Sequence, residues 1–326
     1  MNNKKITDLA SKYNVSITTV SKVIRHCSAV DTNTRQRILN EIQAHSPSDC
    51  GCCDIYCILP DVPHYFWGEL RRSFDEYSPP RDIAVKLNIY THLIDEETVL
   101  HYLSEAEKMN AAVIILSTHI TKRIHDKLNI LLPGRLIILL SEQYPFTNGF
   151  YIGSDPFSDG YAMGKLYTRK LSCNKLGVLR LSVDHNAEKR LSGFLSALKE
   201  SDSVTPSEVI SVTDETYSEK TAAAHIANLL SMHRDTIDCI YSPFGIPRLP
   251  LAVRKAELKP HTILLAHDTF TDFDAITPPK GFHAVCNQSL YTQGSTALSL
   301  AETFIRTGRY PPTKNTYVPS VIRTAD

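Results

Sequence analysis

The first 25 residues carry apolar side chains at helical spacing, in two stripes separated by a break. The members of each stripe lie about one helical turn apart: Ile6, Leu9, Ala10 and Tyr13, followed by Val20, Val23 and Ile24. Asn14 interrupts the pattern, and Ser16 is a suitable N-cap for a second helix that begins at Ile17. Two short helices joined by so tight a turn predict a helix-turn-helix.

A third short helix, capped by Asp31, is predicted to pack its apolar residues Ile38, Leu39 and Ile42 on the other two. Residues 1–48 contain seven basic and three acidic residues, a net charge of +4, in a chain whose 35 basic and 35 acidic residues balance. Such a local excess of positive charge favours contact with nucleic-acid phosphates. A solvated basic face on a generic three-helix domain is the alternative.

From Asp54 onward, short apolar runs alternate with helical stretches. Strands are predicted over 55–59, 83–90, 112–116, 136–140, 151–153, 175–181, 208–212, 239–241, 262–266 and 284–285. Helices are predicted over 66–77, 96–109, 158–171, 187–200, 218–231 and 289–307. This alternation indicates an α/β body with two doubly wound parallel-sheet lobes, each of about five strands.

We therefore predict a small all-α helix-turn-helix domain, a short linker and a two-lobed body. The predicted boundaries are 1–47 for the helical domain, 48–53 for the linker, and 54–326 for the effector-binding and dimerisation body, with lobe 1 about 54–156 and 287–315 and lobe 2 about 157–286 and 316–326. Ligands of such folds bind outside the carboxyl ends of the strands. The predicted site therefore lies between the lobes, among the polar residues that follow the strands.

Composition excludes some classes of protein. No apolar run approaches the roughly 18 residues that a membrane span needs, and the N-terminus lacks the apolar segment of a secretory signal. We expect a cytoplasmic protein whose eight cysteines are thiols. Cys50, Cys52, Cys53 and Cys57 crowd the linker, but they lack the paired spacing of a zinc site. We interpret them as linker and core thiols, with a metal or redox switch as the alternative.

Motifs for catalysis are missing from the chain. Gly160-Tyr-Ala-Met-Gly-Lys165 has one residue too few between its glycines for a phosphate-binding loop, and Leu166 stands where Ser or Thr is needed. Nucleophile-elbow, zinc-protease and dinucleotide-binding motifs are absent as well. We expect neither an enzyme nor a cofactor or metal site.

The string Val15-Ser-Ile-Thr-Thr-Val-Ser-Lys-Val23, followed by Val30-Asp-Thr-Asn-Thr-Arg35, resembles the DNA-binding domain of the LacI family of transcription regulators. The resemblance implies that Ile17, Thr18 and Lys22 read bases in the major groove. It assigns phosphate contacts or positioning to Ser16, Thr19, Ser21 and Arg35, and Arg25 extends the same segment. A solvated helix face remains the alternative for each of these residues.

Four segments of the body also resemble that family, whose body is similar to periplasmic sugar-binding proteins. They are Pro60 to Trp67, Ala187 to Leu198, Ala266 to Phe270 and Pro319 to Arg323. A periplasmic-binding-protein-like fold with a polar effector site is thereby implied. The candidate effector-binding residues are His64, Phe66, Trp67, Asp155, Arg190, Asp268 and Gln288.

These side chains suit a polyol, because a guanidinium forks onto paired hydroxyls, carboxylates accept from them, and Phe66 or Trp67 can stack on a sugar face. Each has an ordinary structural alternative. In these alternatives to effector binding, Arg190 pairs with a neighbouring carboxylate, Asp155 caps the helix that follows it, and Trp67 fills a hydrophobic core.

Three departures from the family pattern stand out. The linker lacks the family's hinge-helix segment, Ser242-Pro-Phe-Gly-Ile-Pro replaces its usual Ala-Asn-Asp, and His64-Tyr65 replaces Asn-Pro. We predict a ligand-responsive repressor of carbohydrate-utilisation genes that binds double-stranded operator DNA as a homodimer. Its partner molecule is a small sugar or sugar derivative. The alternative is a solute-binding sensor with weak or lost operator coupling, because the hinge helix is missing.

Overall fold

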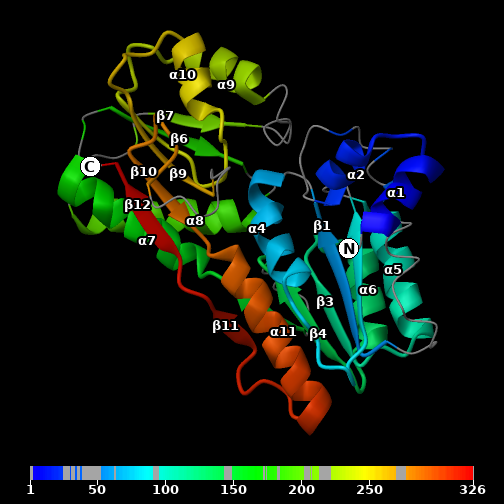
Figure 1. Ribbon diagram of the computed structural model, residues 1–326. Helices are drawn as coiled ribbons and strands as arrows, with labels where there is room; N and C mark the ends of the chain where they lie inside the picture. The colour runs from blue at the N-terminus through cyan, green and yellow to red at the C-terminus, as the bar shows by residue number, and fades with distance from the viewer. Residues whose placement is uncertain are drawn as a thin grey trace.

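The computed structural model describes residues 3–24, 30, 34, 37–38, 53–61, 64–90, 95–142, 149–171, 173, 175–181, 184–201, 206, 208–212, 222–268 and 277–325. Within these ranges the chain forms a small helical unit and two α/β lobes (Figure 1). The predicted DNA contacts Arg25 and Arg35, and the linker cysteines Cys50 and Cys52, lie outside the described residues.

The N-terminal unit is built on two helices, α1 (Asn3–Lys12) and α2 (Ile17–Ile24). Its core consists of Leu9, Ala10, Val20, Val23 and Ile38, with Tyr13, Val15 and Val30 packed against it. Asn14 makes the turn with φ 52, in the left-handed region that asparagine tolerates better than most residues. The Ser16 hydroxyl accepts a hydrogen bond from the Thr19 backbone N–H at 2.9 Å, which confirms the predicted cap.

Lobe 1 contains a six-stranded, all-parallel sheet among the described residues, in the order β11-β5-β4-β3-β1-β2. Its strands are β1 (Ile55–Pro60), β2 (Val85–Tyr90), β3 (Val113–Leu116), β4 (Leu136–Leu140), β5 (Phe150–Gly153) and β11 (Asn315–Tyr317). Its helices are α4 (His64–Asp75), α5 (Glu96–Lys108), α6 (Lys122–Leu131) and α11 (Leu290–Thr307). One core cluster joins α4 and α11 to the sheet, and a second joins α5 and α6.

Lobe 2 repeats this plan in the order β12-β10-β9-β8-β6-β7. Its strands are β6 (Leu176–Arg180), β7 (Glu208–Ser211), β8 (Cys239–Tyr241), β9 (Ile263–His267), β10 (Ala284–Asn287) and β12 (Val321–Thr324), of which β12 alone pairs antiparallel. Its helices are α7 (Pro156–Leu166), the π-helical η1 (Tyr167–Leu171), α8 (His185–Glu200), α9 (Ala222–Ser231) and α10 (Leu249–Lys255). Separate core clusters join α7 and α8, and α9 and α10, to the sheet.

The predicted fold class is confirmed, but each sheet has one strand more than the pattern indicated. The chain passes into lobe 2 after β5, returns through α11, and re-enters lobe 2 between β11 and β12 (Figure 1). The sequence pattern did not predict β11, because Asn315–Tyr317 is only three residues long and two of the three are exposed, so it carries no apolar alternation. Among the described helices, none combines the length and apolarity that a membrane span requires.

Helices α7 and α8 pack backbone against backbone at two glycines. A Cβ on Gly160 would lie 1.8 Å from the carbonyl oxygen of Arg190, and a Cβ on Gly193 would lie 2.0 Å from that of Phe157. Both positions therefore exclude any side chain. The glycines that sequence analysis compared with a phosphate loop lie inside α7, where Gly160 sets the depth of α8 and so of Arg190.

We expect Gly160→Ala to destabilise the protein by roughly 1–3 kcal/mol, because the added methyl group must push α8 away from α7. Urea denaturation of full-length protein measures this loss. Ser192→Ala, on the exposed face of α8, is the control and should leave the midpoint unchanged. Equal midpoints for Gly160→Ala and the wild type would contradict the close contact.

Candidate functional site

Helix α2 has one buried and one exposed face. Val20 and Val23 are fully buried, whereas Ser16, Thr18 and Lys22 are exposed. Ile17 is 53% exposed despite its apolar side chain. Thr19 is half-buried, and its hydroxyl lies 2.8 Å from that of Ser16. The exposed face thus combines hydroxyls, one branched apolar group and one ammonium group.

More positive charge lies close to the small core of this unit. The Lys12 ammonium group lies 5.8 Å from the centre of the Tyr13 ring, and the Arg37 guanidinium lies 5.2 Å from it. Both cations are exposed. The Ser21 side chain, like Arg25 and Arg35, lies outside what the structure describes.

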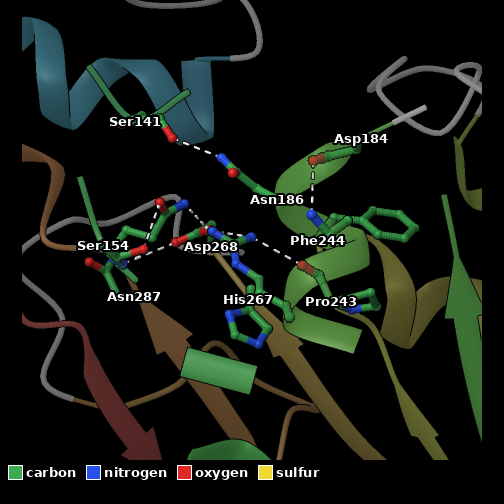
Figure 2. A network of polar contacts seen from close by, with 12 residues as sticks. Ser141, Ser154, Asp184, Asn186, Pro243, Phe244, His267, Asp268 and Asn287 are labelled. Carbon is green, nitrogen blue, oxygen red and sulfur yellow. Dashed lines mark hydrogen bonds and ion pairs between the residues drawn. The ribbon is translucent and has the colours of Figure 1, made fainter. Parts of the chain in front are cut away.

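A second polar site lies where strands of both lobes reach their carboxyl ends (Figure 2). Ser141 follows β4, Ser154 follows β5, Asp268 follows β9 and Gln288 follows β10. Asn186 and Arg190 come from the first two turns of α8, and Gln293 comes from α11. Apart from the half-buried Asp184 and Asp155 nearby, the site is shielded from solvent.

The centre of this site is a buried ion pair. Arg190 is 3% exposed and Asp268 is 5% exposed, with 3.4 Å between Arg190 Nη1 and Asp268 Oδ2. Arg190 Nη1 also donates to the carbonyl oxygen of Pro243 at 3.0 Å. Gln288 donates to both carboxylate oxygens of Asp268, from its backbone N–H at 3.1 Å and from its Nε2 at 2.6 Å.

A chain of hydrogen bonds connects this pair to lobe 1. The Gln288 carbonyl accepts from Gln293 Nε2 at 2.8 Å, and Gln293 Oε1 accepts from the Ser141 hydroxyl at 2.6 Å. Asn186 Nδ2 donates to the Ser141 carbonyl at 2.8 Å, the bridge drawn in Figure 2. Ser154 donates to Gln288 Oε1 at 3.2 Å. The contacts thus link α8 of lobe 2 to the strand ends of lobe 1.

Burial dominates the electrostatics. It raises the pKa of Asp268 to about 6, although Arg190 and the Gln288 donors act to lower it. Burial lowers the pKa of Arg190, but the carboxylates of Asp268, Asp159 and Asp184 outweigh it and raise that pKa above its ordinary value. Burial also lowers the pKa of His267 well below its ordinary value, so this imidazole is neutral.

Several buried polar atoms here have no hydrogen-bond partner within the described structure. They are Arg190 Nε, Arg190 Nη2, Asn186 Oδ1, Asp159 Oδ2 and His267 Nδ1. Buried polar groups in proteins are almost always paired. A ligand that both donates and accepts hydrogen bonds would match this set of donors and acceptors. Hydroxyl groups have that property. No His, Cys, Asp or Glu cluster in the described ranges has the arrangement to hold a metal ion.

The structure brings Arg190, Asp268 and Gln288 together and uses other predicted residues differently. Asp155 caps α7, accepting from the Phe157 and Ser158 backbone N–H groups and from the Ser158 hydroxyl. Trp67 is 3% exposed and belongs to the lobe 1 core, 4.4 Å from the ring of half-buried Phe66. His64 begins α4, and its side chain lies outside the described part.

Ser141, Ser154 and Gln293 were not predicted as site residues. Ser141 and Ser154 each stand directly after a predicted strand, a signal that could have been used. Gln293 lies inside a helix with no such signal. Two of the four clustered cysteines, Cys53 and Cys57, lie in the described part of the chain. Cys57 is buried in β1, and burial raises the pKa of Cys53 to about 11.

Residues 5–46 match the family described as "Bacterial regulatory proteins, lacI family". The chain carries a lacI-family domain at its N-terminus. This confirms the resemblance inferred from the sequence. The HTH-type transcriptional regulator DegA of Bacillus subtilis (strain 168) is 25% identical over 211 residues, which cover 60% of each chain. The present chain therefore spans 60% of the length of that curated relative.

Solved structures similar to the body behind the lacI-family domain share its fold. A solute-binding protein from Burkholderia graminis C4D1M in complex with D-arabinose has a TM-score of 0.68 at 14% identity, covering 85% of this chain and 96% of its own. The Caulobacter myo-inositol binding protein bound to myo-inositol has a TM-score of 0.70 at 17% identity, covering 86% and 96%. At these identities the likeness shows the fold alone.

The raised pKa of Asp268 makes stability depend on pH. Because the folded-state pKa of about 6 exceeds the ordinary value of 3.8, folding favours the protonated carboxyl. The contribution of Asp268 to the free energy of unfolding is thus fully present below about pH 4 and is lost as the pH rises through about 6. We expect the stability of the wild type, relative to Asp268→Asn, to decrease across this window and then level off.

Urea denaturation of both proteins at several pH values between about 4 and 8 measures the difference. Subtracting the variant removes titrations that both proteins share. A difference that stays flat, or that increases with pH, would show that Asp268 is not buried as described.

Proposed function

We propose that this protein is a ligand-responsive transcription regulator, a repressor of carbohydrate-utilisation genes. The observation that carries the proposal is the joining, in one chain, of a lacI-family domain to a two-lobed body with the fold of sugar-binding proteins. The DegA relative, named a transcriptional regulator, supports the same role. Neither the family of the first domain nor the fold of the body suggests catalysis, so we propose a cytoplasmic binding protein without enzymatic activity.

Helix α2 is the proposed reader of operator DNA. Its exposed face offers Lys22 to guanine acceptors, Thr18 to a base edge and Ile17 to a thymine methyl group. The exposed 53% of Ile17 supports this role, because an apolar side chain on a small domain gains from being covered by a partner. Ser16, Thr19, Ser21, Arg25 and Arg35 are proposed to contact or position the phosphates.

A helix of this size reads only a few base pairs. We therefore propose a homodimer whose two α2 helices occupy successive major grooves of a pseudo-palindromic operator. If the protein binds operator DNA no more tightly than random duplex, it is instead a solute-binding sensor without operator coupling.

The effector is proposed to be a neutral sugar or polyol held by Arg190, Asp268, Asn186 and Gln288. Arg190 Nε and Nη2 would donate to ligand hydroxyls, and Asn186 Oδ1 would accept from one. The fold neighbours that hold D-arabinose and myo-inositol support this ligand class. Because Asn186 and Ser141 join the two lobes, a ligand that competes for either group would alter their relative position.

We expect Lys22→Ala to weaken binding to the operator by about 10- to 100-fold, since one base contact of this kind contributes about 1–3 kcal/mol. Binding to random duplex at the same salt should change far less. Fluorescence anisotropy with both DNAs measures the two affinities. Lys122→Ala, an exposed lysine of lobe 1, is the matched control. Equal losses on both DNAs would reject base reading by Lys22.

A thermal-shift screen of sugars, phosphosugars and nucleosides tests the effector site. At 100 times its dissociation constant, a true effector adds about 2.7 kcal/mol to the stability of the wild type. We expect Arg190→Met and the milder Asn186→Ala to lose that shift, while Arg254→Met, exposed on α10, keeps it. An unchanged shift in a folded Asn186→Ala variant would place the ligand elsewhere.

A further inference from the structure

Two cysteines of lobe 2 lie together, away from the polar site. Cys173 follows the π-helical η1, and Cys239 begins β8. The two thiols lie close enough for each to shift the pKa of the other. Cys239 is fully buried in the core cluster beneath α7 and α8, and half-buried Cys173 packs against the same cluster. One sulfur atom is therefore within reach of solvent while the other is enclosed.

The backbone brings the segment that leads into β6 against the start of β8. β6 and β8 are neighbours in the sheet, with Leu176 opposite Cys239. The Lys175 carbonyl accepts from the backbone N–H groups of both Asp238 and Cys239, at 2.8 and 3.1 Å. The entry to β6, which contains Cys173, is thereby fixed against the first residue of β8.

Tyr167 holds Cys173 from the other side. Its hydroxyl donates to the Cys173 carbonyl at 2.8 Å, accepts from the Cys173 backbone N–H at 3.2 Å, and lies 3.5 Å from the sulfur. Tyr167 is the first residue of η1, and π-helical turns within helices occur frequently at functional sites. The local backbone is thus arranged around the Cys173 thiol.

The two thiols differ in acidity. The neighbouring Cys239 thiol is the main cause that lowers the pKa of Cys173 to about 7, and Tyr167 and the Lys175 backbone act in the same direction against burial. Asp238, which acts to raise that pKa, is paired with Lys259 at 2.5 Å. Burial raises the pKa of Cys239 well above its ordinary value. At neutral pH, the thiolate form of Cys173 is therefore more populated than that of an ordinary cysteine, and Cys173 is the nucleophile of the two.

We propose that Cys173 and Cys239 form a peroxide-oxidisable dithiol, a reversible modification site in lobe 2. The Cys173 thiolate attacks one oxygen of hydrogen peroxide, forming an S–O bond as the O–O bond breaks and hydroxide leaves to become water. Cys239 then attacks the sulfenic sulfur, and the disulfide forms with loss of its thiol proton and the sulfenic oxygen as a second water. Each sulfur loses one electron and the peroxide becomes two waters.

The pair lies at the opposite edge of the sheet from the polar site. Cys239 stands at the amino end of β8, whereas the Pro243 carbonyl that accepts from Arg190 follows its carboxyl end. The dithiol is therefore independent of the proposed effector. Its chemistry can be tested whether or not the protein binds DNA or sugar.

Peptide mass spectrometry tests the proposal on full-length protein. Reduced protein is treated with hydrogen peroxide, free thiols are blocked by alkylation, and the digest is searched for the peptide that links Cys173 to Cys239. We expect this peptide in the wild type and its loss on treatment with dithiothreitol. Cys173 should also be alkylated at least 10-fold faster than Cys53 or Cys57 in the untreated protein, because burial raises the pKa of both of those thiols.

Two variants separate the steps. Cys239→Ser should accumulate Cys173 sulfenic acid, which dimedone traps, whereas Cys173→Ser should leave Cys239 reduced. Cys286→Ser, in the same core cluster, is the matched control and should still form the link. A folded wild type that yields no Cys173–Cys239 peptide, or that links Cys173 to another cysteine instead, would overturn the proposal.

Discussion

The arrangement of the body depends on the buried ion pair between Arg190 and Asp268. Removing two charges from water costs several kcal/mol per ion, and their attraction offsets this only when further hydrogen bonds satisfy both groups. Here the Pro243 carbonyl accepts a hydrogen bond from Arg190, and Gln288 donates two hydrogen bonds to Asp268. Those partners follow the ends of β8 and β10, so the sheet must hold its strand ends in register for the pair to persist.

This requirement explains the glycines of α7 and α8. Arg190 reaches the strand ends because α8 lies against α7 at the distance that Gly160 and Gly193 permit. Even so, the pair leaves Arg190 Nε and Nη2 unpartnered. Two such donors on a rigidly held guanidinium suit the proposed effector site, because a group that is already ordered loses less conformational entropy when a ligand binds.

Much of the fold and of the polar site could be predicted from the sequence. Buried parallel strands are recognisable as apolar runs, and the residues that follow them lie together at one edge of the sheet. Asp268 and Gln288 were found in that way, and Arg190 through the resemblance of its helix. The burial of Trp67 in the lobe core could not be decided, since an aromatic residue at helical spacing fits a core and a ligand site equally well. The contact of Asn186 with Ser141 could not be predicted either, because it depends on how the two lobes approach each other and has no local sequence signal.

The two edges of the second sheet illustrate the same limit. At the carboxyl edge, polar residues recur after successive strands, so a single strand pattern predicts a site. At the amino edge, Cys173 and Cys239 are separated by 66 positions, and neither has a motif around it. Only the β6–β8 pairing and the Tyr167 hydroxyl bring them into one environment. Chemistry that arises from strand order, rather than from strand ends, becomes visible only once the sheet is known.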